Sequence, residues 1–167
     1  MWDLIREDYH THEGLCPGFW ALLVARFGAW RYTVYPRALR APFYVLYRIA
    51  FTIVQMLTGI ELPAEVQIGR RLKIEHHSDI IVNGTAVLGD DVVIRNGVTI
   101  GVRHTHEAGS PVIGNRVDIG TGAKVLGAIR IGDDVAIGAN AVVLTDVPPN
   151  SIAVGIPATI RPRRPAA

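Results

Sequence analysis

Cysteine is nearly absent from this sequence, since Cys16 is the only one among 167 residues. A single cysteine excludes an internal disulfide, which is a common support of small secreted domains. The N-terminal sequence MWDLIREDYH also lacks the basic region and the apolar stretch that a secretory signal would carry. We therefore expect a cytoplasmic protein.

The sequence also lacks a strong excess of basic or acidic residues. Lys and Arg number 17 against 15 Asp and Glu, which leaves a formal net charge of +2. The only basic cluster is the terminal group of Arg161, Arg163 and Arg164. This balance does not favour a nucleic-acid surface, so no nucleic-acid partner is expected.

The sequence has no clean membrane-spanning run. Residues 41–62 are the most apolar stretch and are about long enough to cross a bilayer, but Pro42, Arg48 and Gln55 lie within them. A spanning helix is therefore disfavoured. A buried or subunit-facing helix is the favoured interpretation, and membrane contact is expected to be at most peripheral.

A six-residue repeat is present instead, and it predicts the fold. Neither a helix nor an isolated strand produces this period. A smaller apolar residue follows four positions after most of the large ones, and turn-forming pairs such as Gly89-Asp90 and Gly114-Asn115 lie between them. The large aliphatic positions are Ile68, Ile74, Val82, Leu88, Ile94, Ile100, Ile113, Ile119, Val125, Ile131, Ile137 and Val143.

Three such hexads close a triangular coil of about 18 residues, and stacked coils form a parallel β-helix. We expect a mainly β protein, with a helical segment at residues 1–62 and the β-helix with its C-terminal tail at residues 63–167. The register breaks twice. Eight residues separate Ile74 from Val82, and thirteen separate Ile100 from Ile113, so residues 102–110 are predicted to extrude as a loop.

The first break holds the polar sequence EHHSD, residues 75–79. A polar cluster at a distortion of a rigid coil indicates either a functional site or a cap on the coil corner. Histidine is the side chain best suited to proton transfer near neutral pH, which favours the site.

Three longer strings resemble the serine O-acetyltransferases and their shorter relatives associated with exopolysaccharide synthesis. They are IGRRLKIEHHSDIIVNGTAVLGDDVVIRNGVTIG, IGTGAKVLGAIRIGDDVAIGANAVVL and VPPNSIAVGIPA, and the resemblance covers residues 18–162. It implies that the β-helix is left-handed and that acetyl-CoA donates an acetyl group to a hydroxyl of a small acceptor. It also implies that His76 is the general base and that Glu61, in place of the usual aspartate, orients its imidazole.

The resemblance further assigns residues to cofactor and acceptor. The small residues Gly101, Gly120, Thr121 and Ala139 match positions that lie along the pantetheine, although coil corners require small residues in any case. The terminal Arg161, Arg163 and Arg164 are expected either to meet the phosphates of CoA or to form a solvated tail.

The acceptor stays open between L-serine and a saccharide. Arg103 and His104 suit a serine carboxylate, and Glu75 with Asp8 suits its ammonium group. The loop, however, lacks the family's Arg-His-Pro run, and the N-terminal helical region is short, which are features of the exopolysaccharide-associated members.

Two other classes of function remain as alternatives. Carbonic anhydrases with this fold hold zinc through three histidines, but His104 and His106 here are only two positions apart and His76 lies 28 residues earlier. No metal is therefore expected. A catalytically silent scaffold would retain the repeat but has no need of His76 and Glu61. The flat sides of such a β-helix predict a homotrimer, which could pair further through its N-terminal helices into a dimer of trimers.

Overall fold

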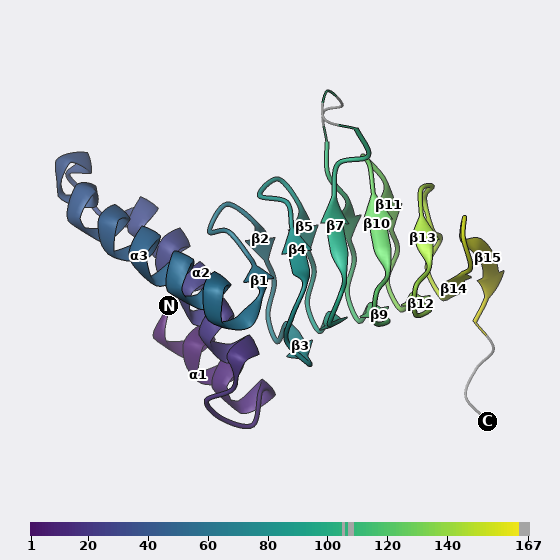
Figure 1. Cartoon of the computed structure of the whole chain (residues 1–167), viewed down its shortest axis with the longest axis horizontal. Coiled ribbons are helices and arrows are strands. Elements are labelled where there is room, and N and C mark those ends of the chain that lie inside the picture. The colour runs from purple at the N-terminus through teal and green to yellow at the C-terminus, as the bar shows by residue number, and fades with distance from the viewer. Residues whose placement is uncertain (105, 107–108, 164–167) are drawn as a thin grey trace.

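The computed structural model describes residues 1–104, 106 and 109–163, and shows a β-helix with helices at one end (Figure 1). The predicted helical segment is present, and it consists of three α-helices and two 3-10 turns. Pro42 lies in the first turn of the last helix, where a missing N–H costs no hydrogen bond, so it does not break that helix. The helices are α1 (Trp2–Thr11), α2 (Pro17–Trp30), the 3-10 turns η1 (Arg31–Thr33) and η2 (Arg37–Leu39), and α3 (Arg40–Thr58).

Short strands form the three walls of the coil. The first wall has the order β1-β4-β7-β10-β13, the second β2-β5-β8-β11, and the third β3-β6-β9-β12-β14-β15. Among the strands of the described residues, only β14 and β15 pair antiparallel. The strands are β1 (Ile60–Glu61), β2 (Gln67–Ile68), β3 (Lys73–Glu75), β4 (Ile80–Val82), β5 (Val87–Leu88), β6 (Val93–Arg95), β7 (Thr99–Gly101), β8 (Val112–Ile113), β9 (Asp118–Ile119), β10 (Lys124–Leu126), β11 (Arg130–Ile131), β12 (Ala136–Ile137), β13 (Val142–Val143), β14 (Ser151–Val154) and β15 (Thr159–Pro162).

Strand pairing confirms the predicted coil length and both breaks. In the third wall Asp118 pairs with Ala136, an offset of 18 residues. Lys73 pairs with Val93 at an offset of 20, and Val93 pairs with Asp118 at an offset of 25. The additional residues lie between β3 and β4 and between β7 and β8, where the sequence analysis placed them.

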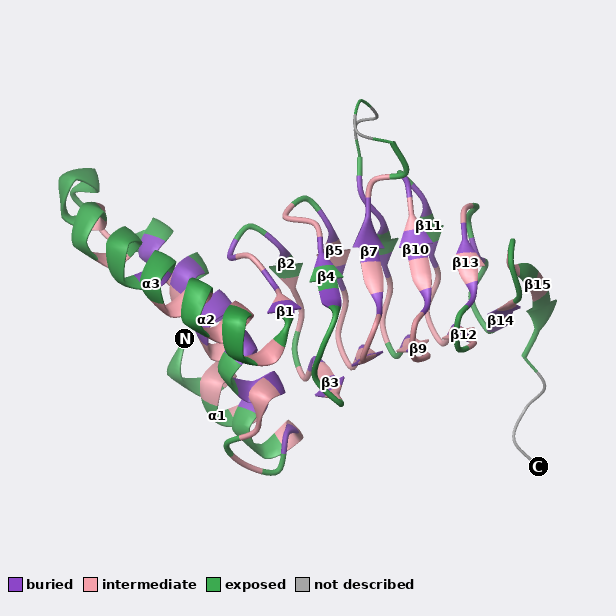
Figure 2. Ribbon diagram, in the orientation of Figure 1, coloured by how far each residue is buried: buried purple, intermediate pink, exposed green. Residues whose placement is uncertain are grey.

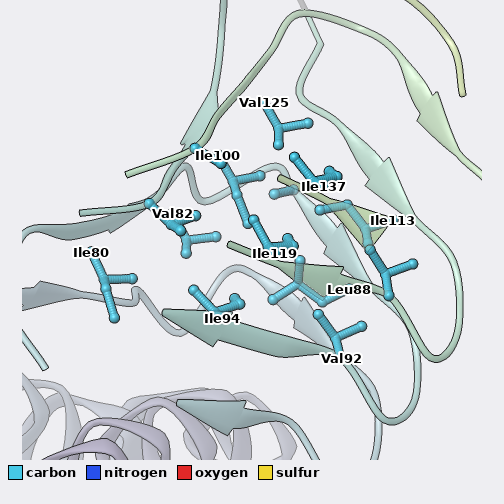
Figure 3. Packing of buried hydrophobic residues seen from close by; sticks show 14 of the residues in the cluster. Ile80, Val82, Leu88, Val92, Ile94, Ile100, Ile113, Ile119, Val125 and Ile137 are labelled. Carbon is cyan, nitrogen blue, oxygen red and sulfur yellow. The ribbon is translucent and has the colours of Figure 1, made fainter. Parts of the chain in front are cut away.

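The predicted aliphatic positions form the core (Figure 3). Every one of them is buried except Ile68, which is partly buried and packs against the others. The smaller apolar positions of the repeat are buried in the same cluster, because each coil directs both classes of side chain inward. They are Ala86, Val92, Val98, Val117, Ala123, Ile129, Val135, Ala141 and Val147.

The helices close one end of this core. Ala21, Leu22 and Ala25 of α2 belong to the same buried cluster as Leu72 and Ile74 of the first coil. The body is thus continuous from α2 into the β-helix, and α3 ends two residues before β1 begins.

Of the two expected placements of α3, burial within one chain is not observed, and contact with another subunit stays a prediction. Tyr47 is its only buried residue, and Figure 2 shows the outer side of the helix exposed. The segment Arg37–Thr58 is long and apolar enough to cross a membrane by length and composition alone.

The coil turns at three corners, which we name by their residues. The histidine corner joins the third wall to the first and contains residues 76–79, 96–97, 121–122 and 139–140. The loop corner follows the first wall and contains Asn83 and the segment after Gly101.

The arginine–aspartate corner joins the second wall to the third. Five residues there adopt a left-handed backbone, with φ between 54° and 59°. Arg71 forms an ion pair with Asp91 at 2.5 Å, and Arg116 forms one with Asp134 at 2.7 Å. The five residues are Arg71, Asp91, Arg116, Asp134 and Asn150.

Candidate active site

His76 lies in an extruded turn at the histidine corner. β3 ends at Glu75 and β4 begins at Ile80, and the turn between them has positive φ at His76 (56°), Ser78 (110°) and Asp79 (52°). Left-handed backbone also occurs once in each coil at the arginine–aspartate corner, so the histidine turn differs in having three such residues within one extruded segment. The His76 side chain is exposed, and it makes no hydrogen bond or ion pair with the described part of the chain. Its imidazole is therefore accessible to a substrate.

Predicted cofactor-binding residues stack on this same corner. Gly97 donates its N–H to the Ser78 carbonyl at 3.0 Å, and Asn140 donates to the Thr121 carbonyl at 2.8 Å. Gly120 precedes Thr121, and a Cβ on it would lie 2.7 Å from the backbone nitrogen of Ala139. The structure thus brings His76, Gly120, Thr121 and Ala139 into one column of successive coils.

Glu61 lies on the outer face of the first wall. It pairs in register with Ile81, and its carboxylate accepts a hydrogen bond from Gln55 Nε2 at 3.1 Å. Gly59, two residues earlier, packs against the backbone of Ser78 and Asp79, so β1 and the histidine turn are neighbours. Within the described chain Glu61 makes no hydrogen bond to His76, and its orienting role stays a prediction.

The carboxylate of Glu75 is held by two cations. Lys73 Nζ lies 3.3 Å from it and Arg95 Nη2 lies 3.1 Å from it. Arg95 also binds Asp118, and hydrogen bonding to that carboxylate, with help from Glu75, raises the pKa of Arg95. Glu75 is thus placed next to His76, as predicted, but its charge is already matched.

Asp8 lies in the interior. It is 1% exposed, and Oδ2 accepts a hydrogen bond from Arg26 Nε at 3.1 Å. Arg26 also donates to the carbonyl oxygens of Ile68 and Gly69, and thereby fastens the helices to the second wall. Burial raises the pKa of Asp8, and Arg26 opposes that rise. This carboxylate is closed to solvent, so its predicted contact with an acceptor ammonium gains no support and stays a prediction.

Gly101, Arg103 and His104 lie at the loop corner instead. β7 runs from the histidine corner to Gly101, which places this group roughly 10 Å or more from His76 along the strand direction. Arg103 and His104 are exposed. One chain therefore divides the predicted site between two corners.

Arg161 and Arg163, two of the three terminal arginines, lie at different places in the fold. Arg161 is exposed and pairs in register with Ile152 in β14. Arg163 donates to the Asp134 carbonyl at 3.2 Å, at the arginine–aspartate corner and away from Ala139. Their predicted contact with CoA is untested, and Arg164 lies outside the described residues.

Sequence reasoning did not assign a role to four polar side chains near these corners. Lys124 Nζ donates to the Gly97 carbonyl at 2.5 Å on the outer face of the first wall, next to the histidine corner. At the loop corner Asn83 Oδ1 accepts from Ser110 Oγ at 2.9 Å and from Thr85 Oγ1 at 2.8 Å. These residues occupy ordinary positions of the repeat, so no sequence signal separates them from structural ones.

His12 is a further residue that the sequence analysis did not single out. It is 7% exposed; its Nδ1 bonds the Asp8 carbonyl at 2.8 Å, and its Nε2 accepts the N–H of Ile74 at 3.1 Å. Ile74 lies in the strand that leads to His76. Burial lowers the pKa of His12, against the bond to the Asp8 carbonyl, which raises it.

The described residues contain no group of three His, Cys, Asp or Glu side chains that could hold a metal ion.

Comparison with known proteins identifies relatives along most of the chain. No protein-family model matches it. It is 44% identical over 142 residues to a serine acetyltransferase of Helicobacter pylori, covering 84% of this chain and 79% of that protein. It is 41% identical over 121 residues to Escherichia coli WcaB, provisionally named a colanic acid biosynthesis acetyltransferase, covering 72% and 73% of the two chains.

A solved structure agrees with these relatives. The serine acetyltransferase from Brucella abortus in complex with coenzyme A superposes with a TM-score of 0.84 at 27% identity, covering 99% of this chain and 70% of that one. A parallel β-helix of hexads with a polar turn at a corner, matched to these proteins, defines an acyltransferase. The chain belongs to the serine acetyltransferase family.

Proposed function

We propose that this chain transfers the acetyl group of acetyl-CoA to the hydroxyl of L-serine, with His76 as general base. The observation that carries the proposal is the exposed imidazole in a left-handed turn, stacked on a column of small residues. The O-acetyltransferase activity of the family supports the reaction class.

The proposed reaction is direct. Neutral His76 takes the hydroxyl proton while the acceptor oxygen forms a bond to the thioester carbonyl carbon. The carbon–sulfur bond breaks, and the CoA thiolate leaves and takes up the proton. No covalent enzyme intermediate is required, and Cys16, in the loop before α2, has no part in the proposal.

The histidine corner suits the donor. Gly97, Gly120 and Ala139 leave little side chain along the corner, so a pantetheine chain can approach the backbone closely. A related structure binds coenzyme A, which supports acetyl-CoA as the donor here. No step of the proposal requires a metal.

We expect the site to be completed between subunits of a homotrimer. The His76 turn and the Arg103–His104 group lie at opposite ends of the first wall in one chain, so a neighbouring chain must supply the second group if both bind one acceptor. Stacking of two trimers through the helices stays a prediction.

A saccharide hydroxyl is the second candidate acceptor. Both carboxylates expected to bind an ammonium group already have cationic partners, since Asp8 pairs with Arg26 and Glu75 with Lys73 and Arg95. A sugar needs no such charge pairing, and the general base acts on either hydroxyl. The similarity to WcaB points the same way.

One assay tests base and acceptor together. Thiol release from acetyl-CoA is measured with L-serine, hexoses and nucleotide sugars for the wild type and for His76→Ala. Loss of a general base should lower turnover by about 10²- to 10⁴-fold. His77→Ala is the matched control, because His77 is an exposed imidazole in the same turn. Near-full turnover in His76→Ala would refute the mechanism.

The acceptor is decided by the same assay with Arg103→Ala. If serine is the acceptor, this change should raise the Michaelis constant for serine selectively, since Arg103 suits the carboxylate. If serine is inert and a sugar is acetylated, the saccharide candidate replaces it.

A further inference from the structure

An apolar stripe on α3 faces outward along the length of the helix. Figure 2 shows this side of α3 exposed at the end of the molecule away from the C-terminus. Large side chains three, four and seven residues apart form the stripe, and each is between 51% and 82% exposed. Its members, which we call the α3 stripe, are Val45, Leu46, Ile49, Ile53, Met56 and Leu57.

The stripe continues into a groove between α2 and α3. The groove has a volume of about 470 Å³ and is lined by apolar side chains alone, including Trp20, Leu23 and Phe27 of α2. Trp20 is itself 43% exposed. An apolar surface of this extent marks an interaction site.

The charged side chains that α2, α3 and their connection themselves carry have one sign, although Glu61 and Glu65 of the first coil contact Gln55 and Arg31. Residues 14–60 contain five arginines and no Asp, Glu or Lys. Two of the arginines are buried and paired, Arg26 with Asp8 and Arg31 with Glu65. The other three are Arg37 of η2, Arg40 at the start of α3, and Arg48, which is exposed on the side of α3.

Exposed tyrosines lie near the N-terminal end of α3, where Arg37 and Arg40 also lie. Tyr35 is 87% exposed, Tyr44 is 50% exposed and Tyr32 is 47% exposed. Tyrosine combines an apolar ring with a polar tip, and its place is the boundary between hydrocarbon and water.

This combination complements a lipid surface better than a second copy of the chain. A second copy that packs its α3 against this one would oppose arginines to arginines, because α3 carries no carboxylate. An anionic bilayer offers phosphates to the arginines and hydrocarbon to the stripe. We propose that the α3 stripe and its groove dock on the surface of a membrane that contains anionic lipids.

The packing of α3 indicates that it lies on the membrane and does not cross it. The Tyr47 hydroxyl accepts the N–H of Ala64 at 3.0 Å, and the Arg31 guanidinium lies 4.6 Å from the Tyr47 ring centroid. One side of α3 is thus fixed to the folded body while the other is open. This proposal does not depend on the transfer reaction.

Co-sedimentation of the full chain with vesicles tests the docking. Binding should be strong to phosphatidylcholine vesicles that contain phosphatidylglycerol, weaker to phosphatidylcholine alone, and reduced by high salt. Tryptophan emission should shift to the blue as the Trp20 ring leaves water, and this shift should be lost in Trp20→Phe. Ile49→Asp with Ile53→Asp should lower binding by about tenfold or more, since both side chains lose their apolar contact.

The control is Ile156→Asp, because Ile156 is an equally large side chain, 73% exposed, near the C-terminal end of the β-helix. It should bind like the wild type. Circular dichroism confirms that each variant is folded. The proposal falls if the wild type does not bind anionic vesicles or if the double variant binds unchanged. A smaller mass of the double variant in light scattering, without vesicle binding by the wild type, would assign the stripe to contact between copies.

Discussion

His12 joins α1 to the strand that leads into the candidate site, and its replacement by alanine tests that connection. The change removes the bond to the Asp8 carbonyl and leaves the N–H of Ile74 without its partner in the interior. Two lost bonds of about 1 kcal/mol each, with about 1–2 kcal/mol more for the unpaired donor, predict a loss of about 3–4 kcal/mol in the free energy of unfolding near pH 8. Urea denaturation at a fixed protein concentration measures it.

The contribution of His12 to the free energy of unfolding should decrease as the pH falls. Burial lowers the pKa of His12 in the folded chain, so below about pH 6.5 the unfolded chain binds a proton that the native chain does not. The contribution of His12 is therefore complete at higher pH and is lost progressively as the pH falls from 6.5 toward the folded pKa. His12→Ala should lack this component, and the difference from wild type should narrow on acidification. His10→Ala, exposed on the same helix, is the control. A difference that is independent of pH would refute the reasoning.

Three further outcomes are expected. Arg26→Ala should destabilise by about 3–5 kcal/mol, because it leaves Asp8 buried and unpaired; thermal unfolding measures this, and Arg37→Ala, an exposed arginine, should change little. Gly89→Ala should lower the melting temperature by several degrees or prevent folding, since its Cβ would lie 2.5 Å from the Gly114 carbonyl oxygen; an unchanged melting curve would contradict that packing. Light scattering at micromolar concentration should give the mass of a trimer, and a monomer would contradict the shared site.

The β-helix was predictable because its information is local and repeated. Each hexad places one large and one small apolar residue inward, so Ile94, Ile119 and Ile137 report the same geometry in successive coils. The two breaks were equally predictable, since a coil of fixed length must extrude any additional residues as a turn or loop. This also made the His76 turn visible.

The contacts that fasten the helices were not predictable in this way. His12 reaches Ile74 across 62 positions, and Arg26 reaches Ile68 across 42, with no period to connect them. The burial of Asp8 follows from such packing. The exposure of α3 was not predictable for the same reason. The apolar composition of the helix does not determine which of its faces packs against the rest of the chain.

The arginine–aspartate corner bears on how the chain avoids misfolding. Coils of one shape are interchangeable in principle, so a β-helix can stack with one coil skipped and still bury its aliphatic residues. At this corner Arg71, Asp91, Arg116 and Asp134 alternate in sign from coil to coil, at backbone angles where glycine would cost less. Skipping one coil would set Arg71 against Arg116. The alternating charges therefore disfavour a stack in which one coil is skipped, because like charges would then face each other.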